Sequence, residues 1–154
     1  MEINEKYISE LFSIQERLKK SLQAFQNGEL ILVGDDGLRE NEVDLVFHAL
    51  GSTAYNVNFA ITHAKGLLCV SLSHDLANNL GFSTAPNLPG GFSHTNFTLS
   101  VDAKHGITSG ISAKDRAHTI ALMAQPNSTI QDFISPGHVF PLRAMNGGLL
   151  ARAG

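Results

Sequence analysis

Short apolar runs alternate along this chain with segments of helical periodicity, and this alternation restricts the fold more than any other feature. The strand-like apolar runs lie at residues 30–33, 43–50, 67–72 and 97–101. The segments with apolar side chains at intervals of three and four lie at residues 8–25, 53–65 and 112–124. Because the two kinds of segment interleave, we predict one α/β layered domain over residues 1–154.

Local signals indicate where several of these elements begin and end. Gly28 follows the first helical segment and predicts its end. Ser73 is expected to cap a short helix, and Ser112 is expected to begin a longer one, with Asp115 in the place of a capping-box acid. The uninterrupted apolar runs at residues 30–33 and 67–72 are predicted to be buried strands, and another short strand is expected at residues 138–140.

The composition is that of an ordinary globular domain. Hydrophobic residues make up 43% of the 154 residues and charged residues 16%. The formal net charge is -3 and no basic run is present, so nucleic acid is not an expected partner. No apolar stretch has the length of a membrane span and residues 1–6 do not resemble a secretory signal, so a cytoplasmic location is expected. Cys69 lies in an apolar run and is predicted to be a buried, inert thiol.

An acidic segment joins the first two predicted strands. Residues 35–44 contain five acidic side chains between two apolar runs. Carboxylates this close together repel one another unless a divalent cation, an arginine or a shared proton compensates the charge. The segment is therefore a candidate metal-assisted acid–base site. The alternative is a solvated turn, since Asp-Asp-Gly is a common turn sequence.

Alternation along an extended backbone would place Glu40, Glu42 and Asp44 on one face. Three carboxylates on one face suit a divalent cation or a proton relay, so Glu42 and Asp44 are candidate catalytic carboxylates. Arg39, directly before them, would hold an anionic substrate or keep the acids ionised.

His138 is the second candidate for acid–base chemistry. It follows a Pro-Gly turn and precedes an apolar pair, so the backbone around it is expected to be well defined. A histidine fixed in this way can act as a general acid or base near neutral pH. A purely structural hydrogen-bonding role is the alternative. The other six histidines show no metal-binding spacing.

Two segments are candidate anion sites. Residues 108–112 carry hydroxyls and backbone amides in front of a predicted helix, where a phosphate can bind. A capped helix with a polar first turn is the alternative. Arg152, Ala153 and Gly154 could begin a backbone nest for an anion, and a solvated terminal arginine is the alternative there.

These segments, taken in order, resemble the 3,4-dihydroxy-2-butanone 4-phosphate synthase family of riboflavin biosynthesis. The resemblance covers nearly the whole chain from about Leu30 onward. The matching segments are Asp-Asp at 35–36, Arg-Glu-Asn-Glu at 39–42, Asp44, Phe-Thr-Leu-Ser-Val-Asp-Ala at 97–103, Gly-Ile-Thr-Ser-Gly-Ile-Ser at 106–112, Asp-Arg at 115–116, Pro-Gly-His-Val-Phe-Pro-Leu-Arg at 136–143 and Gly-Gly at 147–148.

The resemblance implies a three-layer α/β domain with a mixed β-sheet, working as a homodimer with sites near the interface. It implies conversion of D-ribulose 5-phosphate to 3,4-dihydroxy-2-butanone 4-phosphate and formate, with Mg²⁺ or Mn²⁺ as cofactor. Glu40 would be a metal ligand, and Arg39, Glu40 and Asp44 would contact the sugar phosphate. His138 would be the essential histidine, lent across the dimer interface, and residues 152–154 would begin the phosphate-binding loop.

The chain also departs from the family pattern. Gly37 and Leu38 stand where the family has Glu-Asp, and Ser135 stands where it has Arg. The family loop Arg-Gly-Gly-His-Thr-Glu is present only as Arg-Ala-Gly, with Ala153 in place of a glycine, and stops at Gly154. The histidine of that loop would be the second protein ligand of the metal.

We therefore expect a synthase-like domain that lacks the C-terminal part of the family fold. The 154-residue chain alone would have little or no synthase activity, whereas the same segment within a longer chain would catalyse the family reaction. Two alternatives stay open. One is a non-catalytic, degenerate member that binds a sugar phosphate or a protein partner, and the other is an enzyme with altered chemistry on a similar phosphorylated sugar.

Overall fold

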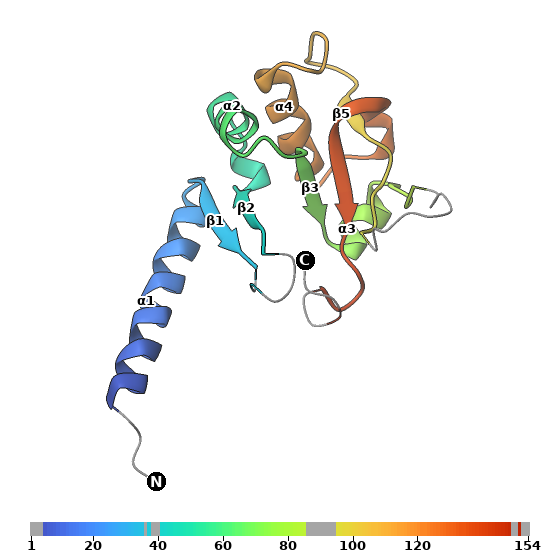
Figure 1. The fold of residues 1–154 in the computed structure, drawn as a ribbon. Helices are drawn as coiled ribbons and strands as arrows, with labels where there is room; N and C mark the ends of the chain where they lie inside the picture. The colour runs from blue at the N-terminus through green and yellow to red at the C-terminus, as the bar shows by residue number, and fades with distance from the viewer. Residues whose placement is uncertain (1–4, 36, 38–40, 86–94, 149–150, 152–154) are drawn as a thin grey trace.

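The computed structural model describes residues 5–35, 37, 41–85, 95–148 and 151 (Figure 1). Helices and strands alternate along the chain, which confirms the predicted α/β class. In chain order the elements are α1 (Glu5–Gln26), β1 (Ile31–Gly34), β2 (Val43–Val46), the 3₁₀ turn η1 (Ala49–Gly51), α2 (Ala54–His63), β3 (Cys69–Leu72), α3 (His74–Asn79), β4 (Val101–Ala103), α4 (Ala113–Met123), the 3₁₀ turn η2 (Ile130–Asp132) and β5 (Phe133–Arg143).

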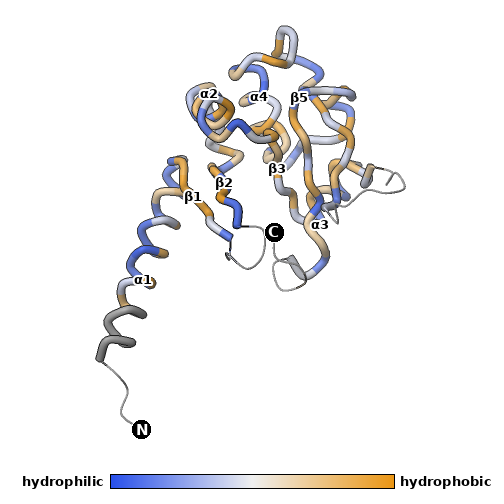
Figure 2. Tube along the Cα trace, viewed as in Figure 1, coloured by the Kyte–Doolittle hydropathy of each residue, from blue (hydrophilic) through white to orange (hydrophobic). Residues whose placement is uncertain are grey.

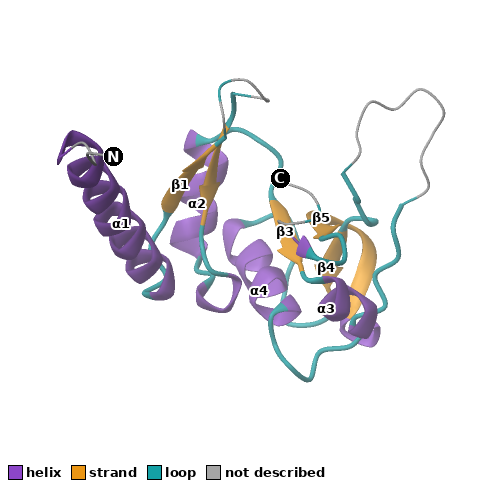
Figure 3. Ribbon diagram, turned by 90° about the horizontal axis from the view of Figure 1, so that it is seen from below, coloured by secondary structure: helices purple, strands orange, loops and turns teal. Residues whose placement is uncertain are grey.

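The described strands form two sheets. β1 and β2 make an antiparallel two-stranded sheet, and β3, β5 and β4 make a three-stranded sheet with β5 in the centre. β5 runs parallel to β3 and antiparallel to β4, so this second sheet is mixed, as the family resemblance implied. Figure 3 shows α1 on one side of the β1–β2 hairpin, and α4 and the three-stranded sheet on the other. None of the described helices combines the length and the apolar character needed to cross a membrane.

The hydrophobic core lies between α2, α3, α4 and the three-stranded sheet. Its completely buried side chains are Val57, Ala77, Leu80, Met123 and Val139. Burial of a large aliphatic side chain stabilises a fold by about 1.5–3 kcal/mol. The strand that supplies Val139 is also the central strand of the sheet, so the core directly supports β5.

Capping residues begin the helices where the sequence predicts them. Ser73 Oγ accepts a hydrogen bond from Leu76 N at 3.2 Å, and Ser112 Oγ accepts one from Asp115 N at 3.0 Å. Gly28 ends the α1 segment with a φ of +80°, a left-handed conformation that glycine adopts readily. These predictions are confirmed because each depends on the local sequence alone.

The burial predicted for the first strand is wrong. Leu32 is 71% exposed and Val33 is 48% exposed. Within the described residues β1 pairs only with β2, in a sheet of two strands. Figure 2 shows β1 among the most hydrophobic parts of the chain, near α1 and away from the central core.

Strand lengths also differ from the predictions. β2 ends at Val46, where a predicted longer strand gives way to the η1 turn. Phe97 and Thr98 form only isolated bridges, and regular pairing begins at Val101. β5 is longer than predicted because Pro136 and Gly137 interrupt its apolar pattern without ending the strand. An apolar run does not specify which of its backbone groups will find partners on another strand.

Candidate acid–base site

The pairing of β4 with β5 contains an irregularity at the centre of the candidate site. Asp102 pairs with Ile134, but the next pair on β4 joins Val101 to Val139. Residues 135–138 therefore lie outside the regular ladder. A bulge of this kind redirects side chains away from the alternation of a flat strand.

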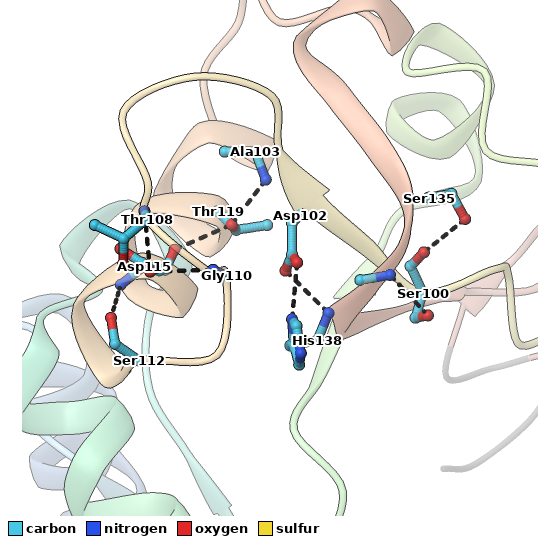
Figure 4. Close-up of polar contacts among 11 residues, drawn as sticks. Ser100, Asp102, Ala103, Thr108, Gly110, Ser112, Asp115, Thr119, Ser135 and His138 are labelled. Carbon is cyan, nitrogen blue, oxygen red and sulfur yellow. Dashed lines mark hydrogen bonds and ion pairs between the residues drawn. The ribbon is translucent and has the colours of Figure 1, made fainter.

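Side chains of β4 and of the residue before it hold this bulge in place (Figure 4). Ser135 Oγ donates to Ser100 O at 2.8 Å, and Gly137 N donates to Ser100 Oγ at 3.2 Å. His138 N donates to Asp102 Oδ1 at 2.9 Å. These bonds give partners to backbone donors that the irregular ladder would otherwise leave unpaired.

The same aspartate also binds the imidazole ring of His138. Asp102 Oδ2 lies 2.8 Å from His138 Nδ1, and the Asp102 side chain is only 5% exposed. A carboxylate only accepts hydrogen bonds, so Nδ1 carries the proton that is shared with it. The His138 side chain is 39% exposed, and its Nε2 has no hydrogen-bond partner among the described residues. A ring bonded in this way can accept or release a proton at Nε2.

Two glycines allow the backbone to approach this pair closely. Gly110 has a φ of +83°, and a Cβ added there would overlap Asp102 Oδ2 and lie 2.9 Å from His138 Nδ1. A Cβ on Gly137 would overlap the backbone at Val101 and Asp102. Neither position can carry a side chain without a shift of the site.

A second aspartate, at the start of α4, fixes the loop that carries Gly110. Asp115 Oδ2 accepts hydrogen bonds from Thr108 Oγ1 at 2.8 Å, Thr108 N at 3.2 Å and Gly110 N at 3.1 Å. The Thr108 hydroxyl is the main reason why the pKa of Asp115 lies below its ordinary value, although burial acts in the opposite direction. The backbone amides of Thr108 and Gly110 and the Ser112 hydroxyl lower it further.

This arrangement changes the interpretation of residues 108–112 as an anion site. The Thr108 and Gly110 amides already donate to Asp115, and the Ser112 hydroxyl caps α4. The structure thus supports the alternative interpretation, a capped helix with a polar first turn. The Asp115 carboxylate does not complete a capping box, because it turns toward the preceding loop.

The acidic segment is only partly extended. Glu42 and Asp44 are exposed, and β2 begins at Val43. Asn41 has a φ of +52°, so the backbone is not extended at this residue. The predicted common face of Glu40, Glu42 and Asp44 stays a prediction, because Glu40 lies outside the described residues. The remaining predicted site residues, Arg39, Glu40, Arg152, Ala153 and Gly154, lie outside the described residues.

The two predicted parts of the site lie in different sheets of the described structure. No hydrogen bond or ion pair between described residues joins Glu42 or Asp44 to His138. Burial raises the pKa of the Cys69 thiol in the three-stranded sheet, and the charge of Asp44 raises it further. The raised pKa agrees with the prediction of an inert thiol.

The described residues do not by themselves form a metal site. No group of three His, Cys, Asp or Glu side chains in the described ranges could hold an ion. The donor type nevertheless fits a hard divalent cation, because Glu42 and Asp44 offer exposed carboxylate oxygens in the same segment as Glu40.

Asp102 is a candidate site residue to which the sequence pattern assigned no role of its own. It stands between Val101 and Ala103 in a strand whose three residues are all buried. A buried aspartate needs a hydrogen-bonding partner to offset the loss of hydration. An aspartate inside an apolar strand is therefore a signal that the sequence contains, but the hydrogen-bond partner of Asp102, His138, lies 36 positions away.

The fold and the site define an α/β domain in which a buried carboxylate holds a half-exposed histidine. Residues 19–154 match the family model described as 3,4-dihydroxy-2-butanone 4-phosphate synthase, and the chain belongs to that family. A synthase of Helicobacter pylori (strain J99) is 46% identical over 141 residues, which are 92% of this chain and 41% of the relative. A synthase of Histophilus somni (strain 129Pt) is 38% identical over 152 residues, which are 99% of this chain and 72% of the relative.

Solved synthases share the fold. A structure described as 3,4-dihydroxy-2-butanone 4-phosphate synthase in complex with two magnesium ions superposes with a TM-score of 0.84 at 40% identity. The match covers 89% of this chain and 64% of the solved one. A cation-free form of such a synthase gives a TM-score of 0.79 at 42% identity, with 89% and 63% covered. The chain therefore spans about two fifths of the Helicobacter relative and under two thirds of these solved chains.

Proposed function

We propose that this protein is a lyase of riboflavin biosynthesis that converts D-ribulose 5-phosphate to 3,4-dihydroxy-2-butanone 4-phosphate and formate. The observation that carries the proposal is the Asp102–His138 pair, which leaves Nε2 available for proton transfer. This pair lies within the part of the chain that matches the synthase family. Residues 1–154 are proposed to form one synthase-like domain.

Proton transfers are what the reaction requires of the protein. Removal of a proton next to the ketone gives an enediolate, and the later loss of water and formate needs further transfers. We assign removal of the proton next to the ketone to His138 Nε2. The transfers during the loss of water and formate are assigned to Glu42 and Asp44, which are exposed to solvent. Arg39, Glu40 and Asp44 are proposed to contact the sugar phosphate, and residues 152–154 its phosphate group.

A divalent cation, Mg²⁺ or Mn²⁺, is part of the proposal. Support comes from the solved synthase that is described with two magnesium ions and from the carboxylate-rich segment of this chain. We propose Glu40 as a ligand of the cation. A bound cation would stabilise the negative charge that develops on the substrate oxygens.

We further propose that the protein works in the cytoplasm as a homodimer, in which one chain lends His138 to the acidic segment of the other. The absence of a hydrogen bond or ion pair between Glu42 or Asp44 and His138 within the described residues is consistent with this arrangement. Nucleic acid and membrane are not proposed as partners.

The test is formate release from ribulose 5-phosphate, with the Histophilus somni synthase assayed in parallel. We expect formate release that depends on added Mg²⁺ and is abolished by EDTA. The variant His138→Gln should lose at least about 10²-fold in rate, the usual contribution of a positioned acid–base group. His105→Gln, which changes an exposed side chain, is the matched control.

Two results would count against the proposal. A folded protein that neither releases formate nor binds ribulose 5-phosphate would contradict it. Binding without release would favour a non-catalytic sugar-phosphate binder instead.

A further inference from the structure

We propose that Asp102 is a positioning residue that keeps the His138 proton on Nδ1 and so reserves Nε2 for the transfer of protons. The catalytic consequence rests on the proposed function, whereas the position of the proton does not. The inference is carried by hydrogen-bond geometry, burial and the irregular pairing of two strands.

Both oxygens of the Asp102 carboxylate serve the same residue. Oδ1 accepts from the backbone N of His138 at 2.9 Å, and Oδ2 lies 2.8 Å from Nδ1 of its ring. One carboxylate thus restrains the main chain and the side chain of His138 together. Asp102 is 4% exposed, and in the described structure both hydrogen bonds of its carboxylate are made with His138. The two hydrogen bonds with His138 offset the hydration that this carboxylate loses on burial.

The backbone departs from regular pairing at this point. If β5 continued the ladder beyond Ile134, backbone groups of β4 would meet Ser135 and the residues after it. The chain instead leaves four residues, 135–138, out of register. Ser100 and Asp102 then provide the acceptors that bind Gly137 N and His138 N. The bulge ends at the residue that carries the imidazole, so its effect is to project that ring from the sheet.

The loop before α4 closes the Nδ1 side of the ring. Gly110 lies so close that an added Cβ would overlap Asp102 Oδ2 and come within 2.9 Å of Nδ1. Gly110 N is in turn bonded to Asp115 Oδ2 at 3.1 Å, which fixes the loop. Protein therefore packs against the bonded nitrogen, whereas Nε2 has no partner in the described structure.

A purely structural role for Asp102 is the competing explanation, and the variant Asp102→Asn separates the two. Asparagine keeps the shape of the side chain and an oxygen that accepts from His138 N. Its NH₂ group donates hydrogen bonds, so it favours an Nδ1 without a proton and moves that proton to Nε2. A structural role alone would leave the ring tautomer unchanged.

The experiment records long-range ¹H–¹⁵N correlation spectra of the ¹⁵N-histidine-labelled 154-residue protein near neutral pH. His138→Gln identifies the His138 signals by their loss. We expect the wild type to show the neutral ring with its proton on Nδ1, and Asp102→Asn to show it on Nε2. Asp132→Asn is the matched control, because Asp132 accepts hydrogen bonds from Thr129 and none from His138 in the described structure.

Formate release provides the second readout. Asp102→Asn is expected to lower kcat by at least about 10²-fold, because a ring with its proton on Nε2 cannot accept a proton there. KM should change little, since no part of Asp102 is assigned to substrate binding. Asp132→Asn should keep the wild-type rate.

Three outcomes would overturn the inference. They are a wild-type His138 with its proton on Nε2, an Asp102→Asn spectrum with an unchanged tautomer, and a reversed tautomer without loss of kcat. If Asp102→Asn does not fold, the wild-type spectrum alone decides. If the wild type releases no formate, the proposed function fails, while the two spectra still test the role of Asp102.

Discussion

Gly110 illustrates how much of the site depends on single residues that carry no reactive group. Its backbone adopts a φ of +83° and packs against both members of the Asp102–His138 pair. A left-handed conformation is costly for a residue with a Cβ, and here the Cβ would also meet a buried carboxylate. Glycine is therefore required at this position on two independent grounds.

The variant Gly110→Ala tests this requirement. We expect a loss of about 1–3 kcal/mol in the free energy of unfolding, from backbone strain and the displaced carboxylate. The measurement is urea denaturation followed by circular dichroism. Gly34→Ala is the control, because a Cβ there meets nothing within 4 Å and its φ is not positive. Equal stability of the two variants would show that the loop carrying Gly110 can shift to accommodate a Cβ without loss of stability.

The sequence predicts His138 as a site residue but does not indicate its partner. His138 was detectable because the flanking Pro-Gly turn and apolar pair are local signals. Asp102 was not, because nothing in the sequence states that β4 pairs with β5 out of register, which is what brings the two residues together. Sequence periodicity describes one strand at a time, whereas this contact is created between two strands.

At the scale of elements, α4 connects helix capping with the candidate site. Ser112 caps the helix, and Asp115 in its first turn binds the loop that carries Gly110. The boundaries of α4 were predicted correctly because capping is local, but the direction of the Asp115 carboxylate was not. That direction depends on donors in a loop whose conformation the sequence pattern does not specify.

The pKa of Asp115 makes a prediction about stability and pH. Its folded-state pKa lies below the ordinary value, chiefly because of the Thr108 hydroxyl. The ionised group therefore stabilises the fold above the unfolded-state pKa, and this contribution is lost as the pH falls through the folded-state pKa. Asp115→Asn should lower the unfolding free energy at pH 7, and the deficit should shrink in acid below about pH 4.

Urea denaturation of wild type and Asp115→Asn at several pH values measures this difference. Asp75→Asn serves as the control, since Asp75 is an exposed acid in the first turn of α3. A deficit that stays constant into acid would mean that the charge of Asp115 makes no contribution.

At the scale of the whole molecule, the described fold consists of a packed body and a more exposed part. β1 and β2 form a sheet of only two strands, and Leu18 and Leu22 of α1 are 58% and 53% exposed. An isolated two-stranded sheet is marginally stable in water. The sequence could not predict this division, because it does not show which apolar faces another element covers.

Hydrogen–deuterium exchange should reveal the same division. Backbone amides of β1 and β2 are expected to exchange through local openings, well before those of β3 and β5, which need the core to unfold. Mass spectrometry of peptic peptides from the two sheets measures the order. A peptide from α2, whose Val57 is completely buried, serves as the slowly exchanging reference. Equal protection of the two sheets would contradict this view.

The central position of β5 has a consequence for heat inactivation. His138 lies on the strand that has a neighbour on both sides and that supplies Val139 to the core. The imidazole therefore loses its setting when the core unfolds, whereas fraying of the outer hairpin leaves it in place. Heating would thus remove the chemistry of this histidine and melt the domain as one event.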